Sequence, residues 1–241
     1  MAEDKYIALG HPSYIWRFGQ DRRLDMVRQS VQLENKRILD IGCGIGVYMS
    51  KFRRFSDEVY GIDVDWDRVR EGRESVPNIC AACSEYLPFA DNTFDVTFLH
   101  EVIEHVADDG KTIREAYRVT KEGGKVVIYA PNRLYPFETH GFYLGKRYVF
   151  RLLPLVNYLP DFLRRIFVPH VRTYFSGDIR RLFDGLNVSF TVHTYVYPGF
   201  DKVAARRPLL AKILRRTLYL AENTPFRIFG LSHFLVVTKI A

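Results

Sequence analysis

The chain has 241 residues, 47% of them hydrophobic, and its 35 basic and 28 acidic residues give a formal net charge of +7. This length and composition suffice for one substantial core, so we expect a single domain over residues 1–241 with an insertion at 133–175. Three cysteines are too few for a disulfide scaffold, which favours a reducing compartment. The charge suits nucleic acid, anionic lipid or an acidic small molecule and selects none of them.

Neither a targeting segment nor a membrane span is expected. Residues 1–10 contain Glu3 and Asp4 and no apolar run, unlike a secretory signal peptide. The longest uncharged apolar stretch of the second half, 152–160, is far shorter than the ~20 residues of a spanning helix. We therefore expect a cytoplasmic protein, attached at most peripherally to the inner face of the membrane.

The first half of the chain alternates short apolar runs with helical patterns. Strands are predicted at 37–41, 58–62, 78–82, 94–99 and 125–130. Helices are predicted at 21–31, 47–55, 66–75 and 104–119. This alternation predicts a parallel sheet with right-handed crossovers.

The alternation ends after Pro131. Residues 133–175 are aromatic, basic and interrupted by prolines, and we interpret them as an insertion of short helices. A helix is predicted at 176–183 with Ser176 as its N-cap. Strands are predicted at 186–197 and 233–240, with one helix over 203–221 between them.

A glycine-rich turn follows the first predicted strand. Asp40 ends that strand, and Gly42, Gly44 and Gly46 follow at alternate positions. Doubly wound α/β folds bind adenosine-containing cofactors at such a strand–turn–helix junction, where glycine lets the backbone approach the ligand. An ordinary glycine-rich turn has the same pattern. Asp63 ends the second strand, where its carboxylate could accept bonds from ribose hydroxyls, cap the next helix or stabilise a turn.

With Asp40 before the glycines, the pattern resembles the class I S-adenosylmethionine-dependent methyltransferases of small-molecule and lipid type. The resemblance continues through 59–63, 87–96 and 101–106, the last of which contains Glu104-His105-Val106. It implies a doubly wound, seven-stranded, mostly parallel sheet with an antiparallel seventh strand, and S-adenosylmethionine as cofactor. A nicotinamide enzyme is disfavoured because the spacing is not G-x-G-x-x-G.

The resemblance also implies cofactor contacts at the matching positions. Asp40 would hold the methionine end together with the backbone of the glycine turn, Asp63 would bind the ribose, and His100 would lie near the sulfonium. The full implied set is Asp40, Gly42, Cys43, Gly44, Asp63, Val64, Cys83, Ser84, Glu85 and His100.

The loop of Cys83, Ser84 and Glu85 would flank the adenine. It departs from the family at Cys83, where an acid often accepts a hydrogen bond from the adenine, and a thiol is a weaker acceptor. Backbone groups near Ser84 or the carboxylate of Glu85 would replace it. Cys80 and Cys83 form a lone C-x-x-C without a second ligand pair, so no metal site is expected.

Methyl transfer from a sulfonium is a direct displacement that needs an aligned acceptor and, for a hydroxyl, a base. The candidate catalytic residues are His100, His105, Glu138 and His140. Glu138 and His140 are favoured as a pair, with a solvated loop as the alternative, and proximity without a base is a further one. His105 is expected to share a helix face with Glu101; a structural histidine bonded to backbone is the alternative.

Basic, aromatic and apolar residues of the insertion resemble an element that lies on anionic membrane, although a lid or a dimer contact would have the same composition. We predict methyl transfer to a small or lipid-like acceptor, at oxygen. The alternatives are an RNA or protein methyltransferase and a non-catalytic cofactor-binding or membrane-associated scaffold. Nucleic acid is less favoured because 99–102 lacks an Asn/Asp-Pro-Pro-aromatic motif and no RNA-binding module is recognisable.

Overall fold

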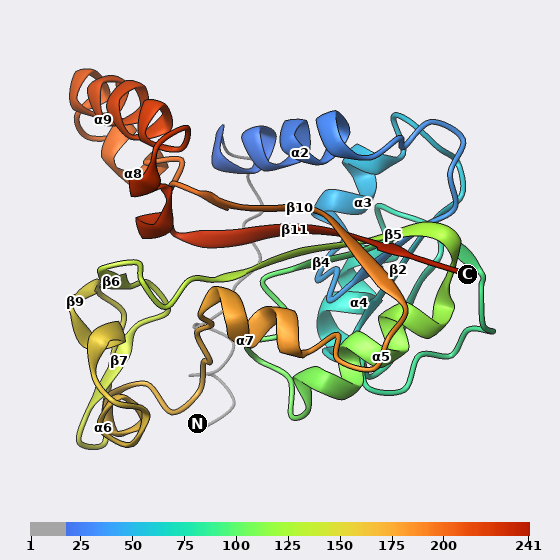
Figure 1. Ribbon diagram of the computed structural model, residues 1–241, viewed down its shortest axis with the longest axis horizontal. Helices are drawn as coiled ribbons and strands as arrows, with labels where there is room; N and C mark the ends of the chain where they lie inside the picture. Colours follow the sequence, from blue (N-terminus) through green and yellow to red (C-terminus); the bar gives the residue numbers. More distant parts are fainter. Residues whose placement is uncertain (1–17) are drawn as a thin grey trace.

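The computed structural model describes residues 18–241 and is shown in Figure 1. The first ten residues, which we considered for targeting, lie outside the described residues. Within the described part, no helix combines the length and the apolar character that a membrane crossing requires.

A seven-stranded sheet forms the centre of the fold, in the order β10-β11-β5-β4-β1-β2-β3. The strands β1 to β5 are parallel to one another. β11 runs antiparallel to β5, and β10 runs antiparallel to β11. This confirms the predicted sheet, including its antiparallel seventh strand. The strands are β1 (Ile38–Ile41), β2 (Val59–Asp63), β3 (Ile79–Ala81), β4 (Phe94–His100), β5 (Thr120–Pro131), β10 (Val188–Val196) and β11 (Ser232–Lys239).

Helices cover both faces of this sheet, which is why β1 is buried along its whole length and is continuously apolar except for Asp40. One core receives Val27, Met49 and Val69 from α2 (Phe18–Ser30), α3 (Val47–Phe52) and α4 (Trp66–Gly72). The other core receives Ile113 and Ile179 from α5 (Asp109–Val119) and α7 (Ser176–Arg181). The carboxyl ends of β1, β2, β4 and β5 therefore share one edge of a doubly covered sheet.

The segment between β4 and α5 is not helical, although we predicted a helix from residue 104. The helix begins at Asp109 because Asp108 caps it, accepting a bond from the backbone N–H of Lys111. Glu101 has a φ of 56°, outside the helical region. The expected sharing of a helix face by Glu101 and His105 is therefore wrong.

Two predictions in the C-terminal part are also wrong. The expected helix over 203–221 is two helices, α8 (Asp201–Ala204) and α9 (Pro208–Ala221), because Pro208 has no N–H to continue α8 and fits the first turn of α9. Ser176 does not cap α7: Phe175 holds the N-cap position, and its backbone N–H donates to the Asp178 carboxylate. A short 3₁₀ helix, η2 (Pro225–Phe229), leads into β11.

The insertion is less helical than expected. It contains two small two-stranded sheets, one 3₁₀ turn and a single helix, and they enclose an apolar cluster of their own around Val156 and Val168. Gly145 turns the chain between two of these strands with a φ of +58°. The elements are β6 (Phe137–Glu138), β7 (Phe142–Leu144), β8 (Arg147–Val149), β9 (Leu153–Pro154), η1 (Val156–Tyr158) and α6 (Asp161–Phe167).

Candidate active site

The glycine turn after β1 is fixed mainly by packing. Gly42 and Gly46 have φ of 73° and 84°, in the left-handed region that favours glycine. A Cβ at Gly42 would lie 2.5 Å from Val102 Cγ2, and one at Gly46 would lie 2.4 Å from Val76 Cγ2. These two positions thus need glycine because protein atoms surround them, which differs from the ligand approach that the sequence suggested.

Asp63 connects the end of β2 to this turn. Its Oδ2 accepts the N–H of Gly44 at 2.8 Å, and its Oδ1 accepts the N–H of Asp65 at 2.9 Å. The alternative in which Asp63 caps α4 is wrong, because Asp65 is the N-cap and accepts from the backbone of Asp67 and Arg68. Each carboxylate oxygen of Asp63 retains a further lone pair for a ligand.

Asp40 is a buried acid whose carboxyl group has no polar partner among the described residues. The residue is 2% exposed, and its carboxylate has no hydrogen-bond or ion-pair partner within residues 18–241. Burial, with a contribution from the negative charge of Asp63, raises the pKa of Asp40 well above its usual value. A buried carboxyl group that lacks a partner is costly, so a cation placed beside it would gain a strong interaction.

Glu85 holds the loop that is expected to flank the adenine. Its Oε2 accepts from the Cys83 thiol at 2.7 Å and from the Ser84 hydroxyl at 3.0 Å. Its Oε1 accepts from the backbone of Ala107 and Asp108. Glu85 therefore joins this loop to the segment before α5, and both of its oxygens are engaged.

The remaining members of the expected cofactor set have different surroundings. Cys43 is buried, and burial raises the pKa of its thiol far above the usual range. Val64 directly follows β2 and is 77% exposed. Cys83 is exposed, and Cys80 is partly buried. All three cysteines are free thiols, as expected for a chain without a disulfide scaffold.

His100, at the end of β4, lies in a partly buried polar cluster with Arg23 from α2. Its Nε2 lies 2.6 Å from Nη1 of Arg23, which also donates to Glu101 Oε1 at 2.9 Å. Ser232 donates to the same Glu101 oxygen and accepts from Arg23. Burial, reinforced by the charge of Arg23, lowers the pKa of His100 to about 3, so the ring is neutral and accepts from the guanidinium.

The surroundings of Glu101 and Glu104 shift the pKa values of their carboxyl groups in opposite directions. Burial acts to raise the pKa of Glu101, but the opposing contributions, of which the charge of Arg23 is the largest, outweigh it and lower the pKa. Burial and the neighbouring negative charge of Glu101 raise the pKa of Glu104 well above its usual value. Both Glu104 oxygens are buried without a hydrogen-bond partner among the described residues.

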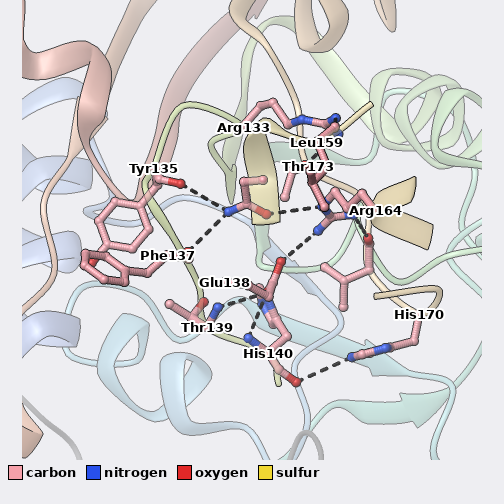
Figure 2. A network of polar contacts seen from close by, with 12 residues as sticks. Arg133, Tyr135, Phe137, Glu138, Thr139, His140, Leu159, Arg164, His170 and Thr173 are labelled. Carbon is pink, nitrogen blue, oxygen red and sulfur yellow. Dashed lines mark hydrogen bonds and ion pairs between the residues drawn. The ribbon is translucent and has the colours of Figure 1, made fainter. Parts of the chain in front are cut away.

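Figure 2 shows the polar network of the insertion, which centres on Glu138. Glu138 is 1% exposed; its Oε1 lies 2.9 Å from Nδ1 of His140, and its Oε2 accepts from Arg164 Nη2 at 2.8 Å. Arg164 also donates to Asn157 and to the carbonyl of Val171. Burial acts to raise the pKa of Glu138, but the bond and charge of His140 and the charge of Arg164 lower it to about 2.

His140 reaches the segment after β4. Ligand atoms of Glu104, His105 and His140 all lie within 4.8 Å of one another, so these residues could hold a metal ion. Burial and the charge of His140 lower the pKa of His105 to about 4. Glu104, His105 and His170 line a cavity of about 690 Å³ between this segment and the insertion. The sequence-predicted pair Glu138–His140 and His105 are therefore brought together, whereas His100 lies in the separate Arg23 cluster.

Sequence reasoning missed Arg23 and Arg164 as parts of the site, whereas Glu104 was among the polar residues noted after the fourth strand. Arg23 lies within a helical pattern far from the motif, and Arg164 is one of many basic residues in the insertion. Neither carries a local signal, because each acts through a partner distant in sequence, 78 residues away for Glu101 and 26 for Glu138. For Glu104, the sequence indication was its place near Glu101 in the segment after the fourth strand.

Comparisons with known proteins agree with this geometry. Residues 39–128 match a family described as a methyltransferase domain. A ubiquinone biosynthesis O-methyltransferase of Aromatoleum aromaticum is 30% identical over 140 residues, 55% of this chain and 59% of that protein. A sterol 4-C-methyltransferase of Caenorhabditis elegans is 34% identical over 104 residues, 40% of this chain and 31% of that protein. The chain thus spans less than two thirds of these relatives.

A solved structure extends the likeness to most of the chain. An S-adenosylmethionine-dependent methyltransferase from Mesorhizobium loti superposes with a TM-score of 0.62 at 18% identity, covering 89% of this chain and 96% of that one. At this identity the likeness shows the fold. Residues 39–128 therefore match a methyltransferase domain, and the strand order gives the chain the fold of the S-adenosylmethionine-dependent methyltransferases.

Proposed function

We propose that the protein transfers a methyl group from S-adenosylmethionine to the oxygen of a small or lipid-like acceptor. The observation that carries this proposal is the buried Asp40 carboxylate, which lies next to the glycine turn and has no partner among the described residues. His140 lies beside Glu104 and His105, which follow the carboxyl end of β4 in the same sheet. The edge at the carboxyl ends of parallel strands is where doubly wound sheets bind their ligands.

The residues present fit the cofactor that the family implies. An α-ammonium group beside Asp40 would supply the cation that this carboxyl group lacks, and would favour its ionised form. Asp63 keeps lone pairs for ribose hydroxyls, and the backbone around Gly42, Cys43 and Gly44 lines the turn between them. Val64 and the loop of Cys83, Ser84 and Glu85 complete the proposed cofactor contacts.

His140 is the proposed general base, with Glu138 as the residue that orients it. Because the Glu138 carboxylate accepts from Nδ1, the free lone pair of the ring lies on Nε2. Bound S-adenosylmethionine would supply an electrophilic methyl group to the acceptor oxygen. Nε2 of His140 would accept the proton of the acceptor hydroxyl.

His105 and His100 have supporting roles in this proposal. His105 borders the cavity next to His140, and its neutral ring can position the acceptor. His100 directs Nε2 toward Arg23, so it is suited to shape the methyl-transfer edge and not to take a proton. Alignment alone contributes strongly to displacement reactions, and the base adds to it.

The acceptor class rests on the relatives. One is named for ubiquinone biosynthesis and one for sterol methylation. A cavity of about 690 Å³ beside His105 has the size of a small-molecule site. The cytoplasm, with peripheral attachment to the membrane, is the proposed location.

The test uses cofactor with a radioactive methyl group, the purified protein and a whole-cell extract. Label in the organic phase, lost in His140→Asn while S-adenosylmethionine still binds by calorimetry, is the expected result. Label in precipitable polymer would replace the acceptor class by RNA or protein. Full turnover by His140→Asn would leave alignment alone as the mechanism, and no cofactor binding by the native protein would overturn the proposal.

A further inference from the structure

Two surface patches combine exposed apolar side chains with cations that have no partner. The insertion patch includes four apolar side chains that are each at least 60% exposed: Leu152, Leu155, Phe162 and Ile166. Its cations are Lys146, Arg147, Arg151 and Arg165, which are exposed and make no side-chain hydrogen bond or ion pair within residues 18–241. Neighbouring Arg133 and Arg164, in contrast, are buried and paired with acids.

The C-terminal patch has the same composition. Its apolar side chains lie on α9 and η2 and are at least half exposed: Leu209, Ile213, Leu220 and Phe226. Its cations, Arg206, Arg207, Lys212 and Arg216, are likewise exposed and without a partner in the described part of the chain. Neither patch contains an exposed acid that could neutralise these cations, apart from Asp161, which is already paired with Arg133.

Leu155 shows that one apolar side chain is held outward at a cost. It has a φ of 62° and is 60% exposed. Glycine or asparagine would adopt this left-handed conformation more easily, so the backbone geometry of the turn does not explain why the residue is leucine. Backbone strain of this kind tends to occur at functional positions.

Both patches lie at the same end of the molecule. In Figure 1 the insertion and the α8–α9 segment occupy one end of the long axis, and the C-terminus lies at the other. Asn132, at the end of β5, joins the two segments: its Nδ2 donates to the carbonyls of Ile228 and Gly230, both at 2.7 Å. Helix α6 directs Arg164 inward to Glu138, while Phe162 and Ile166 on the same helix face outward.

We propose that the insertion patch and the C-terminal patch form one docking surface for an anionic lipid bilayer. The apolar side chains enter the interface between headgroups and acyl chains, and the unpaired cations bind the lipid phosphates. This inference rests on the proposed function in one respect, since it delivers a lipid-like acceptor to the cavity that α6 covers.

The other occupants fit less well. A second copy of this chain, placed symmetrically, would bring the unpaired cations of each patch against their own equivalents, which is unfavourable. Single-stranded RNA would need aromatic platforms for its bases, whereas six of the eight apolar side chains that define the two patches are leucine or isoleucine.

The experiment measures sedimentation of the full chain with vesicles of phosphatidylglycerol and phosphatidylcholine, and with vesicles of phosphatidylcholine alone. We expect binding to the anionic vesicles, weaker binding in high salt, and little binding to the neutral ones. The double variants Phe162→Ser/Ile166→Ser and Leu209→Ser/Ile213→Ser should each reduce the partition coefficient at least about tenfold. Arg151→Glu/Arg165→Glu should do so as well.

Matched controls come from the opposite end of the molecule. Ile240→Ser removes an apolar side chain that is 43% exposed, next to the C-terminus. Arg54→Glu reverses an exposed, unpaired cation after α3, at the amino end of β1. Both should bind vesicles like the native chain, and circular dichroism should show that every variant is folded.

The outcomes separate this inference from the proposed function. Asp63→Ala, which is expected to lose cofactor binding, should still bind anionic vesicles. Equal partition of the native chain and the patch variants would overturn the docking surface even if methyl transfer is found. RNA binding that is lost with Arg151→Glu/Arg165→Glu but retained in Phe162→Ser/Ile166→Ser would replace the bilayer by nucleic acid.

Discussion

The proposed cofactor side and the proposed acceptor side of the candidate site are held together in different ways. On the cofactor side, backbone N–H groups and tight glycine packing position the ligating atoms, and Asp40 remains without a partner. On the acceptor side, Glu138 receives bonds from His140 and Arg164 in a nearly closed side-chain network. A cofactor site can thus be prepared by backbone, whereas an acceptor site depends on buried charges that must be paired.

The acceptor side should therefore be more sensitive to loss of one partner. Arg164→Met leaves the Glu138 carboxylate buried and without its guanidinium, and we expect the insertion to lose about 3–5 kcal/mol of stability. Hydrogen exchange across β6, η1 and α6 measures this loss. The exposed neighbour Arg165→Met should change it by less than about 0.5 kcal/mol.

A second change tests whether the uncompensated charge is the cause. Adding Glu138→Gln to Arg164→Met removes that charge, so it should restore a large part of the lost protection. No recovery in the double variant would mean that packing of the arginine, and not pairing, holds the insertion.

The seam between β11 and the end of the insertion should depend on pH. His233 is buried and its Nε2 lies 2.8 Å from the carbonyl of Tyr174; burial lowers its pKa to about 4. The unfolded chain binds a proton near pH 6.5, so unfolding is favoured as the pH falls from about 7 to 4. The loss at pH 4 is about 3 kcal/mol.

Denaturant unfolding at several pH values checks this expectation. His233→Gln should flatten the dependence between pH 7 and 4, with a residual slope from His193, whose pKa burial and the charge of His233 also lower to about 4. A slope unchanged by His233→Gln would place the acid sensitivity elsewhere.

On the cofactor side, Asp63→Ala should weaken S-adenosylmethionine binding roughly 10- to 100-fold, because hydrogen bonds to a charged group contribute about 1.5–3 kcal/mol. Isothermal titration calorimetry measures the affinity, and thermal unfolding shows whether the chain is folded. An unchanged affinity would remove Asp63 from the ribose site.

The smallest expected effect comes from Asp65→Ala, which also serves as the matched control for Asp63. Its side chain caps α4, so we expect a loss of about 1 kcal/mol in stability. The affinity for the cofactor should stay within about twofold of the native value. A large loss of affinity would mean that the start of α4, and not Asp63, governs ribose binding.

These two sides also differ in how far the sequence predicts them. The strands of the sheet, the turn at Gly42 and the position of Asp63 follow from contiguous apolar runs and short-range spacing, whereas the antiparallel β11 was expected only from the family resemblance. The start of α5 was misplaced because the capping residue Asp108 follows a non-helical segment that contains apolar residues at helical spacing.

The acceptor side was predicted only in part. Glu138 and His140 are two residues apart, so their pairing could be expected from the sequence. Arg164 is indistinguishable from its exposed neighbour Arg165 along the chain, although one is 3% exposed and paired and the other is a surface residue. Such choices depend on tertiary packing, which periodicity does not record.

The place of β11 in the sheet has a consequence for synthesis of the protein. β11 pairs with β5 on one side and β10 on the other. During translation, β5 therefore has an open hydrogen-bonding edge until residues 232–239 emerge, about a hundred residues later. An unpaired, apolar strand edge is a site of aggregation. Val126, Val127 and Ile128 are therefore open to pairing with other chains throughout that interval. A chaperone that binds this strand edge would prevent such pairing.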